Sequence, residues 1–154
     1  MTVTVLHRGN PIARDLMPQL LARVRTLSEQ LEGVGDPGIL CRSIELNFMA
    51  PDPQIIAIVA VDDGRVVGHT VCSLDQWLGH KYVMVLQYQL DGALPREIVR
   101  KQMAKVEEWG RNHGAVELRA LVTGDTLERA YRAFYGFQRK QVLITRPIPQ
   151  RQEA

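Results

Sequence analysis

The chain has 154 residues, of which 45% are hydrophobic and 23% are charged, and its formal net charge is +2. These values are typical of one soluble globular domain with a single core. So small a net charge gives no electrostatic argument for binding nucleic acid or a membrane surface. No apolar run approaches the roughly 20 residues that a membrane span requires, and the first residues lack the basic and apolar segments of a secretory signal.

The N-terminal third of the chain predicts a strand and two helices. Residues 2–6 alternate polar and apolar side chains, which favours a short strand. Apolar residues then recur at helical spacing over 12–31. Because a proline lacks the N–H of a helix interior, Pro18 predicts that the regular helix starts near Asp15 or kinks there. After a break rich in glycine and proline, a second short helix is expected over 39–49.

The middle of the chain predicts the centre of a sheet. Residues 55–61 are continuously apolar, which suits a central strand covered on both faces. The sequence Asp-Asp-Gly-Arg at 62–65 is typical of a hairpin turn. A long strand is expected over 66–77, followed by a turn at 78–80 and a third strand over 82–90.

The C-terminal part predicts two helices and two strands. Pro95 suits the first position of a long helix that ends near Asn112, and Asp125 suits the N-cap of a shorter helix. The remaining elements are a strand over 116–122, the short helix over 125–134 and a last strand over 141–146. One domain is expected over 1–148, with a frayed tail over 149–154.

The two cysteines, Cys41 and Cys72, fall in a predicted helix and a predicted strand. Small buried thiols in a reducing compartment are the first interpretation, and a disulfide or a reactive thiol is the alternative. No spacing of cysteine and histidine matches a zinc site, so no metal is expected.

Three stretches, in this order, resemble the GNAT superfamily, the Gcn5-related N-acetyltransferases. Residues 60–69 resemble the family's second and third strands, residues 106–115 the end of the helix after the cofactor loop, and residues 131–137 the closing helix with its Gly-Phe step. The resemblance covers nearly the whole chain. It implies an α+β fold with a mixed, mostly antiparallel sheet of about six strands and about four flanking helices. It also implies acetyl transfer from acetyl-CoA to an amine.

The resemblance places the cofactor beside the strand that ends at Leu90. Family members bind its pyrophosphate with backbone amides at a helix N-terminus, usually after a basic residue and two spaced glycines. Here the helix start, residues 95–100, holds no glycine, its proline removes one donor, and Glu97 adds a negative charge. The alternative is that its basic residues form a solvated helix face. The residues expected to hold the cofactor are Gln89, Leu90, Asp91, Arg96 and Arg100.

The resemblance also implies catalytic candidates. Many members place a tyrosine four residues before the Gly of Gly-Phe, where its hydroxyl protonates the departing thiolate. Arg132 stands at that position here, so the flanking Tyr131 and Tyr135 are the candidates, with a core-facing Tyr131 as the alternative. Asp91 is the best-placed carboxylate for a general base. His69 and Asp75, on the neighbouring strand, are interpreted as surface residues or satisfied polar residues, with a role as base as the alternative.

A narrower resemblance leads to a second hypothesis. Residues 75–87, followed by a helix start poor in glycine, resemble the GNAT-like proteins carried by tailed bacteriophages. That resemblance implies a non-catalytic structural or assembly component, whose partners are other protein chains or further copies of itself. Both hypotheses imply the cytoplasm of a bacterial host cell, and the second adds the phage particle.

Overall fold

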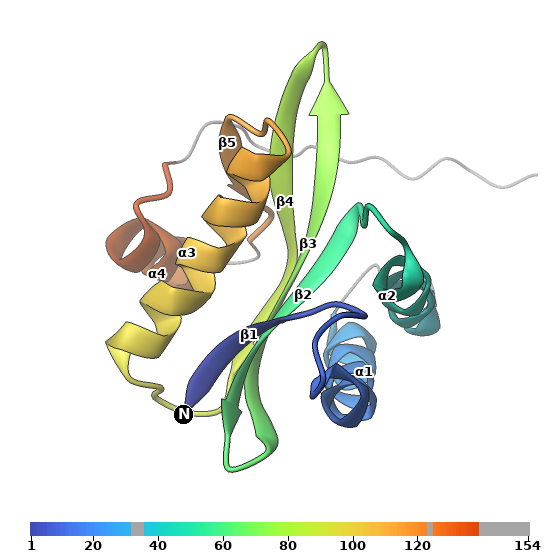
Figure 1. Ribbon diagram of the computed structural model, residues 1–154. Coiled ribbons are helices and arrows are strands. Elements are labelled where there is room, and N and C mark those ends of the chain that lie inside the picture. Colours follow the sequence, from blue (N-terminus) through green and yellow to red (C-terminus); the bar gives the residue numbers. More distant parts are fainter. Residues whose placement is uncertain (32–35, 123–124, 139–154) are drawn as a thin grey trace, which may run out of the picture. The chain divides into compact units, whose positions relative to one another are not determined.

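The computed structural model describes residues 1–31, 36–122 and 125–138 (Figure 1). The chain falls into two compact units, Met1–Leu121 and Val122–Ala154. The first unit contains five strands and three helices, and helix α4 (Asp125–Tyr135) belongs to the second. The strand expected over 141–146 and the tail over 149–154 lie outside the described residues. The single domain over 1–148 therefore stays a prediction.

The five strands form one sheet in the order of the chain, β1-β2-β3-β4-β5. The first three pairings are antiparallel, and β4 pairs with β5 in parallel. The mixed, mostly antiparallel sheet confirms the predicted fold class. The strands are β1 (Thr2–Leu6), β2 (Ile55–Asp62), β3 (Arg65–Trp77), β4 (His80–Leu90) and β5 (Glu117–Ala120).

Helices cover both faces of this sheet, as Figure 1 shows. Helices α1 (Ala13–Gln30) and α2 (Gly38–Met49) lie on one face, and α3 (Arg96–Asn112) lies on the other. Strand β2 is buried from Ile56 to Val61, which confirms the central strand covered on both faces. Its residues on the α1 side join the buried stripe of α1 in the main core.

Helix α1 begins earlier than its proline predicts. It starts at Ala13, two residues before Asp15, and contains Pro18. The first turn is closed by the Ile12 carbonyl oxygen, which accepts from the amides of residues 15 and 16 at 3.2 Å. Because Ala13 is fully buried, packing holds this turn even though Pro18 leaves one carbonyl of the turn without its helical donor.

The two hairpin turns follow from their residues. Asp63 and Gly64 have φ values of 46° and 74°, and Leu78 and Gly79 have φ values of 49° and 84°. Two central residues with positive φ define the type I′ turn that suits the twist of antiparallel strands. Both predicted turns are therefore confirmed.

Helix α3 approaches the sheet closely near its C-terminal end. A Cβ atom at Gly110 would lie 2.7 Å from Cγ2 of Val83 on β4. Glycine is thus required here by space, and it fixes the height of α3 above β4.

Candidate active site

The outer edge of β4 pairs with another strand along only the first half of its length. Its parallel pairing with β5 runs from Tyr82 to Val85 and stops there, although β4 continues to Leu90. Alternate residues of a strand direct their N–H and C=O groups toward each edge. Among the described residues, the outer edge of 86–90 therefore has no strand partner.

A β-bulge lies where this pairing ends. Val85 opposes Cys72 on β3, whereas Gln87 opposes the preceding residue, Val71. Leu86 is therefore one extra residue on β4. Bulges bend a strand and increase its local twist, and this one lies directly after the last residue of β4 that pairs with β5.

The end of β4 packs tightly against β3. The Asp91 amide donates to the Val67 carbonyl oxygen at 2.8 Å. A Cβ atom at Gly68 would lie 2.9 Å from Cδ2 of Leu90 and 3.3 Å from Cδ1 of Leu94. Only glycine at position 68 lets the loop after β4 lie this close to the sheet.

This loop leads directly into α3. Gly92 has a φ of 63° and makes the turn. Pro95 has a φ of −53° and a ψ of 136°, so it precedes the helix. The first helical position expected for Pro95 is therefore wrong. The Pro95 carbonyl oxygen accepts from the amides of Ile98 (2.9 Å) and Val99 (3.3 Å). Because Arg96 is the first helical residue, the proline removes no amide from within the helix.

The start of α3 is locally basic. Arg96 and Arg100 are exposed. Glu97, whose charge argues against phosphate binding, pairs with Lys101 at 2.5 Å. The hydrogen bond from that ammonium lowers the pKa of Glu97. Three cations thus accompany one anion that is already paired, which favours an anion at the helix N-terminus.

Asp91, the predicted base, is held by a residue from α1. Arg23 donates from Nη1 to Oδ2 of Asp91 at 2.8 Å and from Nη2 to Oδ1 at 2.9 Å. The Arg23 side chain is 18% exposed and that of Asp91 is 53% exposed. The hydrogen bonds from Arg23 lower the pKa of Asp91. This bidentate pair keeps the carboxylate ionised and makes it a weaker proton acceptor.

The Arg23 contact continues inward as a series of hydrogen bonds. Arg23 Nε donates to Nδ1 of His69 at 3.4 Å, and Nε2 of His69 lies 3.2 Å from Oε1 of Gln87. Gln87 Nε2 then donates to Oγ of Ser28 at 2.8 Å and to the Val24 carbonyl oxygen at 3.3 Å. Every donor meets an acceptor if His69 is neutral and carries its proton on Nε2. We call this series the polar chain; its side chains are Asp91, Arg23, His69, Gln87 and Ser28.

The inner members of the polar chain are buried. His69 is fully buried, and Gln87 is 5% exposed. Desolvation by burial is the largest influence on His69 and lowers its pKa to about 4. The imidazole therefore stays neutral near pH 7. Of the two interpretations of His69, the satisfied polar residue is confirmed and the surface residue is excluded. The polar chain joins α1 to the end of β4, where the loop toward α3 begins.

The other predicted site residues lie in both units. Gln89 and Leu90 are half-buried at the end of β4, next to the loop that leads to Arg96. Tyr131 lies in α4, and its ring meets the Phe137 ring edge-on at a centroid distance of 5.2 Å. The side chain of Tyr135 lies outside the part of the chain that the structure describes. The catalytic roles of both tyrosines stay predictions.

Sequence reasoning missed Arg23 and the role of Gln87. In the sequence, Arg23 is one of several charged residues beside the apolar stripe of α1. A usable signal is strand alternation, because His69 lies two residues before the buried Val71 and therefore on the same face. A polar residue on an inward face requires a hydrogen-bond partner. A histidine on this face therefore predicts a polar side chain on the helix that covers it, which is Arg23 of α1.

Solved structures share this architecture. A probable acetyltransferase superposes with a TM-score of 0.68 at 13% sequence identity, covering 99% of this chain and 100% of the other. Aminoglycoside N-acetyltransferase AAC(6')-Iy in complex with CoA superposes with a TM-score of 0.67 at 17% identity, covering 95% and 93%. The aminoglycoside acetyltransferase meta-AAC0020, from an uncultured soil metagenomic sample, gives a TM-score of 0.67 at 13% identity, covering 97% and 96%.

The chain has a GNAT-like fold. That part of the predicted resemblance is confirmed, including the mixed sheet and the four described helices. No family model matches the sequence, and no curated protein matches it either. At these identities the structural similarity establishes the GNAT-like fold alone.

Two further findings bear on the kind of site. Within residues 1–31, 36–122 and 125–138, no group of three metal-ligating side chains lies together. None of the described helices combines the length and the apolar character needed to span a membrane. The expected thiols are confirmed, since Cys41 and Cys72 are both free and buried.

Proposed function

We propose that this chain is an acetyl-CoA-dependent N-acetyltransferase that acts on a primary amine. The observation that carries the proposal is the unpaired outer edge of β4. Strand β5 ends at Ala120, opposite Val85, so the outer edge of 86–90 has no strand partner among the described residues, and that edge leads to the basic start of α3. Several of the similar solved structures are acetyltransferases, and some of them contain CoA.

The residues of this end of the sheet fit the cofactor. Backbone groups of Gln89, Leu90 and Asp91 would bind its pantetheine arm along the free strand edge. The start of α3, with Arg96 and Arg100, would bind the pyrophosphate. Acetyl-CoA supplies a thioester whose carbonyl carbon is attacked by the amine. Gly68 permits the close packing of Leu90 and Leu94 against β3 at the start of this loop.

The remaining proton transfers fall to residues of the chain. We propose that a tyrosine of α4, Tyr131 or Tyr135, protonates the departing thiolate. Asp91 stays the candidate base, and its bidentate pair with Arg23 also gives it a positioning role for the loop. Replacing Asp91 by Asn separates these roles. Loss of a base changes the pH profile of kcat, whereas loss of positioning raises the KM for acetyl-CoA.

Calorimetry with CoA and acetyl-CoA tests the cofactor site directly. Ligand at 100 times its Kd adds about 2.7 kcal/mol to the free energy of unfolding, so the melting temperature should rise by several degrees. The variants R96Q and R100Q should each weaken CoA binding roughly tenfold, because each removes a phosphate ligand. K105Q on the same helix is the matched control and should leave binding unchanged. No binding at millimolar CoA would refute the proposal.

One observation favours a second function, that of a non-catalytic module that binds other protein chains. Helix α2 exposes three large apolar side chains, Ile39 (57%), Leu46 (75%) and Met49 (62%). Their spacing places them along one side of the helix, and such exposed apolar groups are typical of interaction surfaces. This hypothesis includes the phage structural component.

Two measurements test the second function. The oligomeric state of the wild type and of L46E, measured by light scattering, reports self-association through α2. Mass spectrometry of purified phage particles tests the virion role, and absence of the chain from the particles counts against it. CoA binding with no acetylation of any amine would favour this function over the first.

A further inference from the structure

A cavity of about 420 Å³ lies at the other end of the sheet. Its floor is formed by the buried residues Leu6, Ile44 and Ala57, and the half-buried Met17 and Phe48 form its walls. Its volume is within the range of small-molecule sites. The interior of the cavity is therefore apolar and large enough for a ligand.

The rim of this cavity is basic. Its lining includes His7 and Arg8, and it includes no aspartate or glutamate. Arg8 is exposed and makes no ion pair with any described residue. The Gly9 amide donates to Nδ1 of His7 at 3.2 Å, so Nε2 is the ring nitrogen that can donate to a ligand. An apolar interior below a cationic rim matches a ligand with an apolar body and an anionic head.

One edge of the rim is held by hydrogen bonds of an asparagine. The side chain of Asn10 donates to Oγ1 of Thr4 at 2.8 Å and to the Val5 carbonyl oxygen at 3.0 Å. These bonds fix the loop between β1 and α1 that carries His7 and Arg8. This edge of the cavity is thus formed before any ligand binds.

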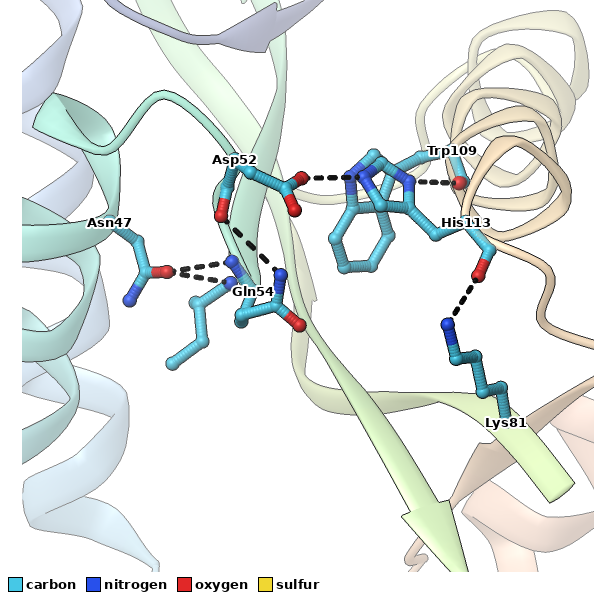
Figure 2. Close-up of polar contacts among 7 residues, drawn as sticks. Asn47, Asp52, Gln54, Lys81, Trp109 and His113 are labelled. Atoms are coloured by element: carbon cyan, nitrogen blue, oxygen red, sulfur yellow. Dashed lines mark hydrogen bonds and ion pairs between the residues drawn. The ribbon is translucent and has the colours of Figure 1, made fainter. Parts of the chain in front are cut away.

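The opposite edge is held in the same way, as Figure 2 shows. Oδ1 of Asn47 on α2 accepts from the amides of Gln54 (2.8 Å) and Ile55 (3.1 Å). Oδ1 of Asp52 lies 3.1 Å from Nε2 of His113 at the end of α3. The Asp52 carboxylate, which lies between the lining residues Pro51 and Pro53, thus contacts α3 and is not part of the cavity lining.

We propose that this cavity binds an amphipathic carboxylate, with its chain on the apolar floor and its carboxylate at Arg8. A water molecule occupies about 30 Å³ in the liquid, so the cavity has room for roughly 14 non-hydrogen atoms. A straight-chain acid the size of decanoate fits this space. Each methylene that leaves water strengthens binding, and the guanidinium selects the anionic head group.

The cavity is separate from the proposed cofactor site. Its residues on β2 are Ile55 and Ala57, which pair with Ser73 and Val71 of β3. Leu90, beside the cofactor loop, pairs with Gly68 instead. Gly68 lies three residues from Val71 and five from Ser73 along β3, so the cavity and the cofactor loop are roughly 10–17 Å apart along this strand. Binding of a carboxylate here does not depend on the proposed function.

Isothermal titration calorimetry with decanoate, decanol and decylamine tests the proposal. Decanoate should bind with the highest affinity and decylamine with the lowest. The variant R8E should weaken decanoate binding at least tenfold and leave decanol binding within twofold of the wild type. The matched control is R14E, a charge reversal at an exposed arginine of α1 outside the cavity. It should leave decanoate binding within twofold of the wild type.

Both Arg8 and Arg14 are exposed, so both variants should fold, and circular dichroism checks this. Equal weakening by R8E and R14E would indicate only a general charge effect and would overturn the proposal. So would equal affinity for decanoate and decylamine, or no heat of binding at millimolar decanoate. Saturating CoA, added in a separate titration, should leave the decanoate affinity unchanged.

Discussion

Lowering the pH from 8 to 5 should destabilise this protein through one buried side chain, His69. Its pKa is 6.5 in an unfolded chain and about 4 in the folded protein, where burial disfavours the imidazolium. The unfolded state therefore binds a proton that the folded state excludes. The stability that His69 contributes is fully present above pH 6.5 and is lost as the pH falls from 6.5 toward 4. At pH 5 the loss is about 2 kcal/mol, and below pH 4 it approaches about 3 kcal/mol.

Urea denaturation at pH 8 and pH 5 measures this effect as a difference between two variants. H69N should be less stable than the wild type at pH 8, because Arg23 and Gln87 lose a partner. Its stability should fall by about 2 kcal/mol less than that of the wild type between the two pH values. Carboxylates titrate in both proteins, so their contribution to the change in stability cancels in the comparison. H7N, at an exposed histidine, should keep the pH dependence of the wild type. Equal losses in H69N and the wild type would refute the neutral, buried state of His69.

Three further predictions concern packing and the polar chain. G110A should lower the free energy of unfolding by about 1–3 kcal/mol in urea denaturation, because its Cβ atom meets Val83. R23M should lower it by about 2–4 kcal/mol in the same assay, because it leaves Asp91 and the buried chain without a donor. Cys72, with a pKa raised by burial to about 12, should react with a thiol reagent at pH 8 only after denaturation.

Each of these predictions has a control in the same chain. E107A, at an exposed position of α3, should change stability by less than about 0.5 kcal/mol, and a loss as large as that of G110A would contradict the packing argument. R65M removes an exposed arginine at the start of β3 and should be far milder than R23M. For the thiols, reaction of Cys72 in the native C41S variant would contradict its burial.

The strands and turns were predictable because their signals are local. The continuous apolar run at 55–61 indicates a strand covered on both faces, and glycine at positions 64 and 79 indicates tight turns. Each signal needs only neighbouring residues. The start of α1 was not predictable from Pro18 alone, because the burial of Ala13 outweighs one missing hydrogen bond.

The site was harder to predict because its contacts join residues far apart in the sequence. Arg23 and Asp91 are 68 positions apart, and nothing near either residue indicates the other. The bulge at Leu86 depends on the register between two strands, which the alternation of one strand does not reveal. The end of β4 at Leu90 was predictable from the strand pattern, whereas the role of the residues there stays a prediction.

The bulge on β4 has a consequence for how this sheet could change. Because it consists of one inserted residue, the side chains before and after it keep their faces: Val85 stays opposite Cys72 and Gln87 opposite Val71 whether or not Leu86 is present. Loss of a single codon would therefore straighten the strand without exchanging its inside for its outside. One deletion would thus separate a bent strand from a regular one, and the same hydrophobic core could support both.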